Sequence, residues 1–161
     1  MSVPNMAHRR ALIRLLTSEH KLSVELLRRA QPVVPRHRRI CRFCRRKMAV
    51  GTEGHVLLDC TDGRLLALRA PFLADATGCL GPIIQNRIHV WPAIRMLDFL
   101  LTKDAFLPRL AQFTYDVFAL VETVPLFQVV DEASYNALPS LPRTTNTSYI
   151  PYISLCRSAQ K

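Results

Sequence analysis

Hydrophobic residues recur at intervals of three and four positions in several parts of the chain, most regularly over residues 104–122. This spacing places apolar side chains on one face of an α-helix, where they pack into a hydrophobic core. No long segment alternates polar and apolar residues as a half-buried β-strand does. The sequence therefore predicts a mainly α fold. The apolar positions of the strongest helix are Phe106, Leu110, Phe113, Val117 and Val121, flanked by Leu107 and Phe118.

Shorter helices are predicted by the same periodicity. In the first of them, Leu12, Leu15 and Leu16 share one face. Thr52 is placed to cap the third through its hydroxyl group, and Pro71 is expected to kink the fourth. These helices cover residues 6–16, 22–30, 52–58, 63–76 and 92–101.

Turn-forming and polar residues indicate how the chain is divided. Residues 78–86 contain Gly81-Pro82 and are expected to form a loop. From residue 131 onward Pro, Ser, Thr and Asn dominate without a sustained period, which is typical of a disordered tail. We therefore expect a small helical domain in three parts: basic helices with a metal-binding module (1–76), a helical buttress (77–130) and a disordered C-terminal tail (131–161).

Positive charge is concentrated in the first third of the chain. The whole chain has a formal net charge of +10, from 22 Lys and Arg residues and 12 Asp and Glu residues. Residues 1–47 hold 13 of the basic and 2 of the acidic side chains, a net charge of +11, so the remainder carries −1. A basic module attached to a near-neutral helical part is the arrangement that this distribution predicts.

Few targeting signals are visible. No stretch reaches the roughly 18 uncharged apolar residues of a membrane span, and the apolar run near the start is too short for a secretory signal. No acidic residue precedes Glu19, as in transit peptides, but Ser is scarce there. We expect a nuclear or cytoplasmic protein without a membrane partner, mitochondrial import being the lesser alternative.

Four residues within a span of 20 have the spacing of a zinc site: Cys41-x2-Cys44-x10-His55-x4-Cys60. Zinc is held by about four thiolate or imidazole ligands in a tetrahedron, and C-x-x-C allows both sulfurs to face one ion. Four protein ligands leave no open position on the metal. The motif therefore predicts a structural zinc site and not a catalytic one.

The other reading of these residues is that they are core cysteines and a surface histidine, since cysteine often packs as a small hydrophobe. The odd total of five cysteines and the C-x-x-C pair favour a reduced, metal-binding protein over a disulfide scaffold. His37 is the one plausible substitute ligand. Cys79 and Cys156 have no partner at ligand spacing and are expected to be bystanders, and His89 beside Trp91 is expected to be a packed pair.

The densest charge run surrounds the first two ligands. Arginine and lysine neutralise the phosphate backbone of nucleic acids, and an aromatic ring can stack on a base. A solvated charged face is the ordinary alternative. The sequence favours contact with RNA or DNA, without choosing between them, through Arg36, Arg38, Arg39, Arg42, Phe43, Arg45, Arg46 and Lys47.

Residues 38–46 (RRICRFCRR) and 53–60 (EGHVLLDC) resemble the C-terminal zinc-binding segment of non-LTR retrotransposon reverse transcriptases, in the form seen in fungal elements. The basic helix pair in residues 10–28 and the Leu/Arg-rich helix after the motif fit the same resemblance, which covers residues 8–76 well and 90–127 loosely. It implies that Cys41, Cys44, His55 and Cys60 are the zinc ligands.

Parts of that family's pattern are missing. The chain contains no Asp-Asp pair, so the polymerase core is absent, and no endonuclease signature is visible. Pro71 and Gly54 also depart from the pattern. The resemblance therefore implies a detached terminal fragment.

Three functions are open on this basis. The first is a zinc-stabilised nucleic-acid-binding module, non-catalytic by itself and without a small-molecule substrate. The second is a vestigial or structural protein without specific binding. An enzyme is not expected, because a zinc deaminase needs His-x-Glu and Pro-Cys-x-x-Cys, whereas Ile40 precedes Cys41 and Val56-Leu57 follows His55.

Overall fold

The computed structural model describes residues 3–81, 86 and 90–140. In this part of the chain the regular structure is helical, and the backbone pairs elsewhere only at two isolated bridges. The mainly α prediction is confirmed. In chain order the helices are α1 (Met6–Leu16), α2 (Ser23–Arg28), η1 (Arg36–Arg38), η2 (His55–Asp59), α3 (Gly63–Leu80), α5 (Ala93–Leu101), η3 (Asp104–Phe106), α6 (Leu107–Thr123) and α7 (Glu132–Asn136).

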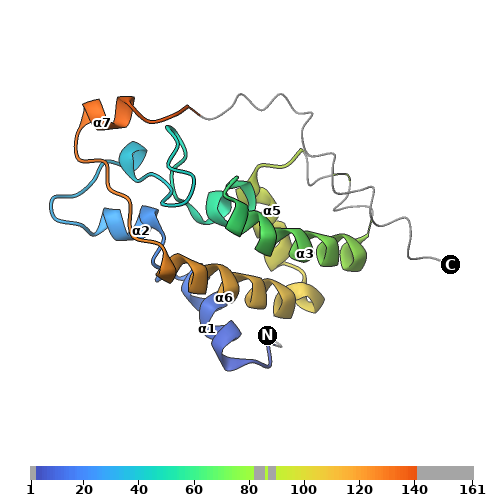
Figure 1. The fold of residues 1–161 in the computed structure, drawn as a ribbon. Helices are drawn as coiled ribbons and strands as arrows, with labels where there is room; N and C mark the ends of the chain where they lie inside the picture. The colour runs from blue at the N-terminus through green and yellow to red at the C-terminus, as the bar shows by residue number, and fades with distance from the viewer. Residues whose placement is uncertain (1–2, 82–85, 87–89, 141–161) are drawn as a thin grey trace.

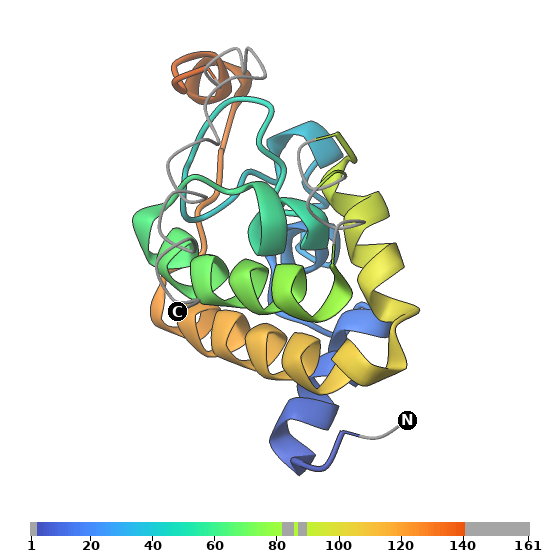
Figure 2. The same cartoon turned by 90° about the vertical axis from the view of Figure 1, so that its right-hand side faces the viewer.

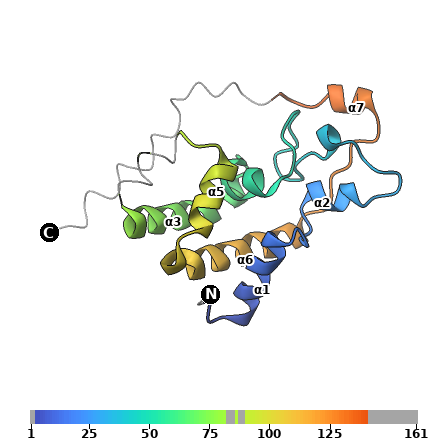
Figure 3. The same cartoon turned by 180° about the vertical axis from the view of Figure 1, so that it is seen from behind.

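Helix α6 packs against both α1 and α3. α3 and α6 lie side by side with opposite chain directions (Figures 1 and 2), and α1 packs against α6. Between α3 and α6 the ring of Phe72 stacks on that of Phe113, with their centroids 4.1 Å apart. Helix α5 contacts α6 and η2 and crosses the direction of α3 in the view from behind (Figure 3). The predicted stripe is confirmed as core, since all five of its members are buried.

Helix α1 has the bounds predicted for it. The side chain of Asn5 accepts hydrogen bonds from two backbone N–H groups of the first turn, which would otherwise lack partners. Leu12 and Leu15 are buried as expected, but Leu16 is 51% exposed. The reason is that α6 covers only the side of α1 that carries the first two leucines.

Helix α3 is longer than the hydrophobic pattern predicts. It continues to Leu80, so residues 78–80 of the expected loop are helical, as is Asn86, while residues 82–85 lie outside the described part of the chain. Pro71 is within the helix but lies on its exposed side, where the carbonyl group that the missing N–H leaves free is accessible to solvent. Of the helices described, α3 included, none has both the length and the apolar character needed to cross a bilayer.

The prediction places the start of the disordered tail too early, at residue 131. Residues 132–136 form α7, and Tyr135 packs with Ile40 and Val129 in a second, smaller core cluster. The periodicity in this segment is too short to predict a helix, and the contact that stabilises it comes from the other end of the chain. Residues 141–161, together with Cys156 and His89, lie outside the described residues.

A contrast between two glycines tests the packing of the loop that precedes η2. A Cβ atom at Gly51 would lie 2.9 Å from the Cβ of Ser23 and 3.2 Å from the Cα of Cys41, whereas one at Gly63 would meet nothing within 4 Å. We expect Gly51→Ala to lower the free energy of unfolding by about 1–3 kcal/mol through overpacking. Gly63→Ala should leave it unchanged or raise it by up to about 1 kcal/mol. Urea denaturation measures both, and equal values for the two variants would contradict this packing.

Candidate metal centre

The structure brings Cys41, Cys44, His55 and Cys60 together. Their ligand atoms all lie within 4.8 Å of one another, and Cys41 and Cys60 are completely buried. The Sγ atoms of Cys41 and Cys60 are 3.8 Å apart, and the Sγ atom of Cys44 is 3.4 Å from Nε2 of His55. A tetrahedron with metal–sulfur bonds of about 2.3 Å and metal–nitrogen bonds of about 2.0 Å has edges of about 3.8 and 3.5 Å. This Cys3His cluster can therefore hold a metal ion.

The first two ligands are positioned by a closed loop. The backbone N–H of Cys41 donates to the carbonyl oxygen of Ala49 at 2.8 Å, and Ile40 pairs with Val50 in an antiparallel bridge. Within the loop, the N–H of Arg45 donates to the carbonyl oxygen of Cys41 at 3.0 Å, which folds Cys44 back toward its neighbour. The C-x-x-C spacing thus has the turn that it needs to direct both sulfurs to one point.

The second two ligands are brought together by an unusual turn. His55 and Cys60 are five positions apart, and an α-helix would place such a pair roughly 140° apart around its axis. Instead, η2 is a π-helix in which the N–H of Cys60 donates to the carbonyl oxygen of His55 at 2.7 Å. The wider turn brings the imidazole and the thiol to the same side. Isolated π turns are rare and occur frequently at functional sites.

The helical segment that leads into η2 begins after Thr52, as predicted, and it is also tied to the rest of the fold. The hydroxyl oxygen of Thr52 accepts a hydrogen bond from the N–H of His55 at 3.3 Å. The guanidinium group of Arg69, on α3, is 2% exposed, and its Nε donates to the carbonyl oxygen of Leu57 at 2.8 Å. Arg69 occupies a core position between Leu65 and Phe72, at helical spacing from both. That position was the sequence signal for a buried arginine, which the sequence analysis missed.

The pKa values of the ligand side chains are shifted in different directions. Hydrogen bonds to Cys44 and Cys60, followed by burial, raise the pKa of the Cys41 thiol far above its ordinary range. Hydrogen bonds from Cys41 and Cys60, aided by His55, lower the pKa of Cys44. Burial alone would lower the pKa of His55, but the hydrogen bonds and charges of Cys44 and Cys60 outweigh it and raise that pKa to about 9. Without a metal, the cluster therefore pairs a thiolate with an imidazolium.

Three of the eight residues predicted to contact nucleic acid are buried: Arg39, Arg42 and Phe43 are 9%, 6% and 7% exposed. The Nη1 of Arg42 donates to the carbonyl oxygens of Val121 at 3.0 Å and Val124 at 2.9 Å, where α6 ends. Arg39 donates to backbone carbonyl groups in and after α2. Both guanidinium groups are thus bound to backbone carbonyl groups within the fold, and Phe43 belongs to the hydrophobic core.

The other five predicted contact residues are placed on or near the surface. Arg36 and Arg45 are exposed, and Arg38, Arg46 and Lys47 are half-buried. All five lie in the loop that carries Cys41 and Cys44 or in the segment just before it. The structure thus retains a basic surface next to the candidate metal centre, formed by part of the predicted set.

The remaining candidate ligands do not join the cluster. The side chain of His37 is half exposed and lies 3.7 Å from the carboxylate of Glu132. Cys79 is an exposed free cysteine on α3. The set of four predicted from spacing therefore needs no substitute among the described residues.

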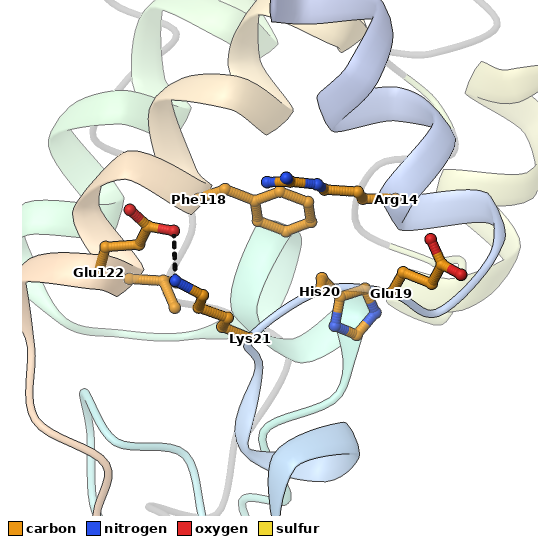
Figure 4. Close-up of a pocket in the computed structure, with 7 residues that line it drawn as sticks. Arg14, Glu19, His20, Lys21, Phe118 and Glu122 are labelled. Carbon is orange, nitrogen blue, oxygen red and sulfur yellow. Dashed lines mark ion pairs between the residues drawn. The ribbon is translucent and has the colours of Figure 1, made fainter.

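His20 links α1 to the ligand-bearing turn, a role that the sequence did not indicate. Its side chain is fully buried, and its Nε2 donates to Oε1 of Glu53 at 2.8 Å. This hydrogen bond lowers the pKa of Glu53. Figure 4 shows His20 beside Phe118 at a surface pocket of about 330 Å³, whose rim includes the ion pair of Lys21 and Glu122. The pair of His20 and Glu53 fixes the residues immediately before His55.

Comparisons with known proteins identify no relative. No protein-family model matches the chain, and the same is true of the curated proteins and the solved structures that were searched.

Proposed function

We propose that this chain is a zinc-stabilised nucleic-acid-binding module that is non-catalytic by itself. The observation that carries the proposal is the Cys3His cluster, whose donor set of three thiols and one imidazole suits zinc. The loop that supplies Cys41 and Cys44 also presents Arg45, Arg46 and Lys47. A metal that fixes this loop would hold those cations in a defined arrangement toward a phosphate backbone.

The origin of the module is a separate proposal. We infer descent from the C-terminal segment of a retrotransposon reverse transcriptase, on the ligand spacing and the basic flanking sequence. The ligand spacing and the flanking sequence support this origin whether or not the chain binds nucleic acid.

Zinc uptake is expected to release protons. At pH 7 the metal-free cluster holds protons on Cys41 and His55, as the directions of their pKa shifts indicate, and both must be lost before sulfur and nitrogen can coordinate zinc. The affinity for zinc should therefore fall as the pH falls. Calorimetric titration with zinc in buffers of different ionisation enthalpy measures the protons released. A binding enthalpy that is the same in every buffer would contradict this assignment.

Nucleic-acid binding is tested by removing charges next to the cluster. We expect Arg36→Gln/Arg46→Gln to weaken binding of a fluorescein-labelled oligonucleotide and to lower the slope of log K against log salt by about 1.4, or about 0.7 for each lost phosphate contact. The matched control is Arg95→Gln/Arg109→Gln, which removes the same charge from α5 and α6. Fluorescence anisotropy at rising KCl concentration gives the slopes.

The alternative is a structural protein without specific binding. One observation favours it: the guanidinium groups of Arg39 and Arg42 donate hydrogen bonds to backbone carbonyl groups within the fold. Equal losses in the test and control variants, or no salt-sensitive binding by the wild type, would support this alternative and contradict the proposed function.

A further inference from the structure

Residues 127–140, here called the C-terminal arm, lie across the basic face formed by Arg38, Arg45 and Lys47. Figure 1 shows α7, which belongs to the arm, beside the loop that contains this face. Lys47 donates two hydrogen bonds to the arm. The Nζ atom of Lys47 donates to Oδ1 of Asn136 at 2.8 Å, and the backbone N–H of Lys47 donates to the carbonyl oxygen of Pro139 at 2.8 Å. The predicted nucleic-acid surface is therefore partly occupied by the chain itself.

Two aromatic rings of the arm lie against cations of the basic face. The guanidinium carbon of Arg45 is 5.1 Å from the ring centroid of Phe127, and the ammonium nitrogen of Lys47 is 5.2 Å from that of Tyr135. A cation over an aromatic ring is also the contact that arginine and lysine make with the bases of a single strand. The rings of the arm thus stand where unstacked bases would stand.

The arm leaves part of the basic face unsatisfied. Nη1 of Arg38 makes a long hydrogen bond of 3.4 Å to the carbonyl oxygen of Val130, while its Nε is buried without a hydrogen-bond partner. Val130 itself is 84% exposed. A phosphate group would offer charged oxygens as hydrogen-bond acceptors to both nitrogen atoms of Arg38, where the arm accepts one hydrogen bond through a neutral carbonyl and adds the charge of Asp131 without a hydrogen bond. The arm therefore leaves a hydrogen-bond donor of the basic face for a phosphate oxygen to occupy.

We propose that the basic face is a binding site for single-stranded nucleic acid and that the C-terminal arm covers it in competition with that strand. The inference rests on the proposed function and adds to it a substrate class and a means of regulation. Single strands are favoured over duplexes because only unstacked bases expose the ring faces that Arg45 and Lys47 would contact.

The arm is held by a small apolar cluster. Its buried anchors are Val129 and Tyr135, which pack on Ile40 apart from the main core. If the arm leaves the face uncovered about one tenth of the time, the apparent affinity for a strand is about tenfold below the intrinsic value. Removing Tyr135 together with Phe127, which packs against the same cluster, would restore that factor.

The test uses the full zinc-loaded chain and a fluorescein-labelled oligothymidylate about 20 nucleotides long, enough to span one binding site. We expect Phe127→Ala/Tyr135→Ala to bind this probe about tenfold more tightly than the wild type, and with a steeper salt dependence. Tyr115→Ala is the control, because it removes an exposed tyrosine of α6 whose ring contacts His8 of α1, and it should leave the affinity unchanged.

The possible outcomes distinguish a failure of the arm's competition from a failure of the proposed nucleic-acid binding. Salt-sensitive binding by the wild type with no gain in the double variant overturns the arm's competition alone. No binding by either protein overturns the proposed function as well. An equal gain for a duplex of the same length overturns the preference for single strands.

A second measurement needs no variant and so does not depend on its folding. Saturating the wild-type protein with the oligothymidylate should speed hydrogen exchange at the amide of Lys47, which donates to Pro139, and at the amides of α7. Exchange that stays the same or slows at these amides, in a sample that binds the probe, overturns the displacement of the arm.

Discussion

Cys44→Ala is expected to abolish stoichiometric zinc binding and to leave the chain without a cooperative thermal transition. Structural zinc sites contribute about 10–16 kcal/mol of apparent binding free energy, which equals or exceeds the 5–15 kcal/mol by which folded domains are typically stable. Cys44 is the suitable ligand to remove because it is only half-buried. Its loss therefore leaves a smaller cavity than the loss of Cys41 or Cys60. Metal analysis of the purified protein and circular dichroism on heating measure the two effects.

The matched control is Cys79→Ala, which removes the same thiol from an exposed position on α3. It should keep one zinc ion per chain and the wild-type melting temperature. A chelator should reproduce in the wild type what Cys44→Ala does, since both remove the metal from the same cluster. Metal content and melting that are identical in the two cysteine variants would show that the cluster does not stabilise the fold through a metal.

Arg42→Met is expected to lower the free energy of unfolding by about 4 kcal/mol, with no nucleic acid in the experiment. The side chain donates to the carbonyl oxygens of Lys21, Val121 and Val124, and so closes the C-terminal end of α6. A hydrogen bond from a charged donor contributes roughly 1.5–3 kcal/mol, and a buried carbonyl left without a partner costs a similar amount. The melting temperature should fall by about 10 °C. Calorimetry of the zinc-loaded proteins measures it.

Arg46→Met separates this structural role from a role in binding. Arg46 lies four positions from Arg42 in the same charge run but is half-buried at the surface. Its replacement should change the free energy of unfolding by no more than about 0.5 kcal/mol while weakening salt-dependent binding. Comparable losses of stability in the two variants would mean that Arg42 does not hold the end of α6.

Local hydrophobic periodicity was sufficient to predict most of the helices, and the spacing of cysteine and histidine residues was sufficient to predict the four candidate ligands. The spacing of Phe106, Leu110 and Phe113 depends only on the geometry of one helix, and the structure confirms it. The C-x-x-C pair likewise needs only a single turn. Both features are set by residues within a few positions of each other, so one sequence contains enough information to find them.

The burial of Arg39 and Arg42 could not be predicted in this way. Arg42 and Arg46 look alike in a run of cations, but the acceptors of Arg42 include a carbonyl 79 positions further along the chain. Phe43 is buried for the same reason, because elements distant in sequence cover the loop. The π turn at His55 is also invisible locally, since residues 52–58 have an ordinary helical pattern. Each of these depends on tertiary contacts that no local pattern encodes.

The position of Arg42 next to Cys41 has a consequence for the order in which the chain is made. The ligand loop is complete in sequence once Cys60 has left the ribosome, yet the carbonyl groups that hold its arginine belong to Val121 and Val124. A nascent chain shorter than this carries all four ligands and the carbonyl group of Lys21, but it lacks the other two acceptors of Arg42. Metal capture during synthesis would therefore come first, and the final seating of the loop would wait for the last turn of α6.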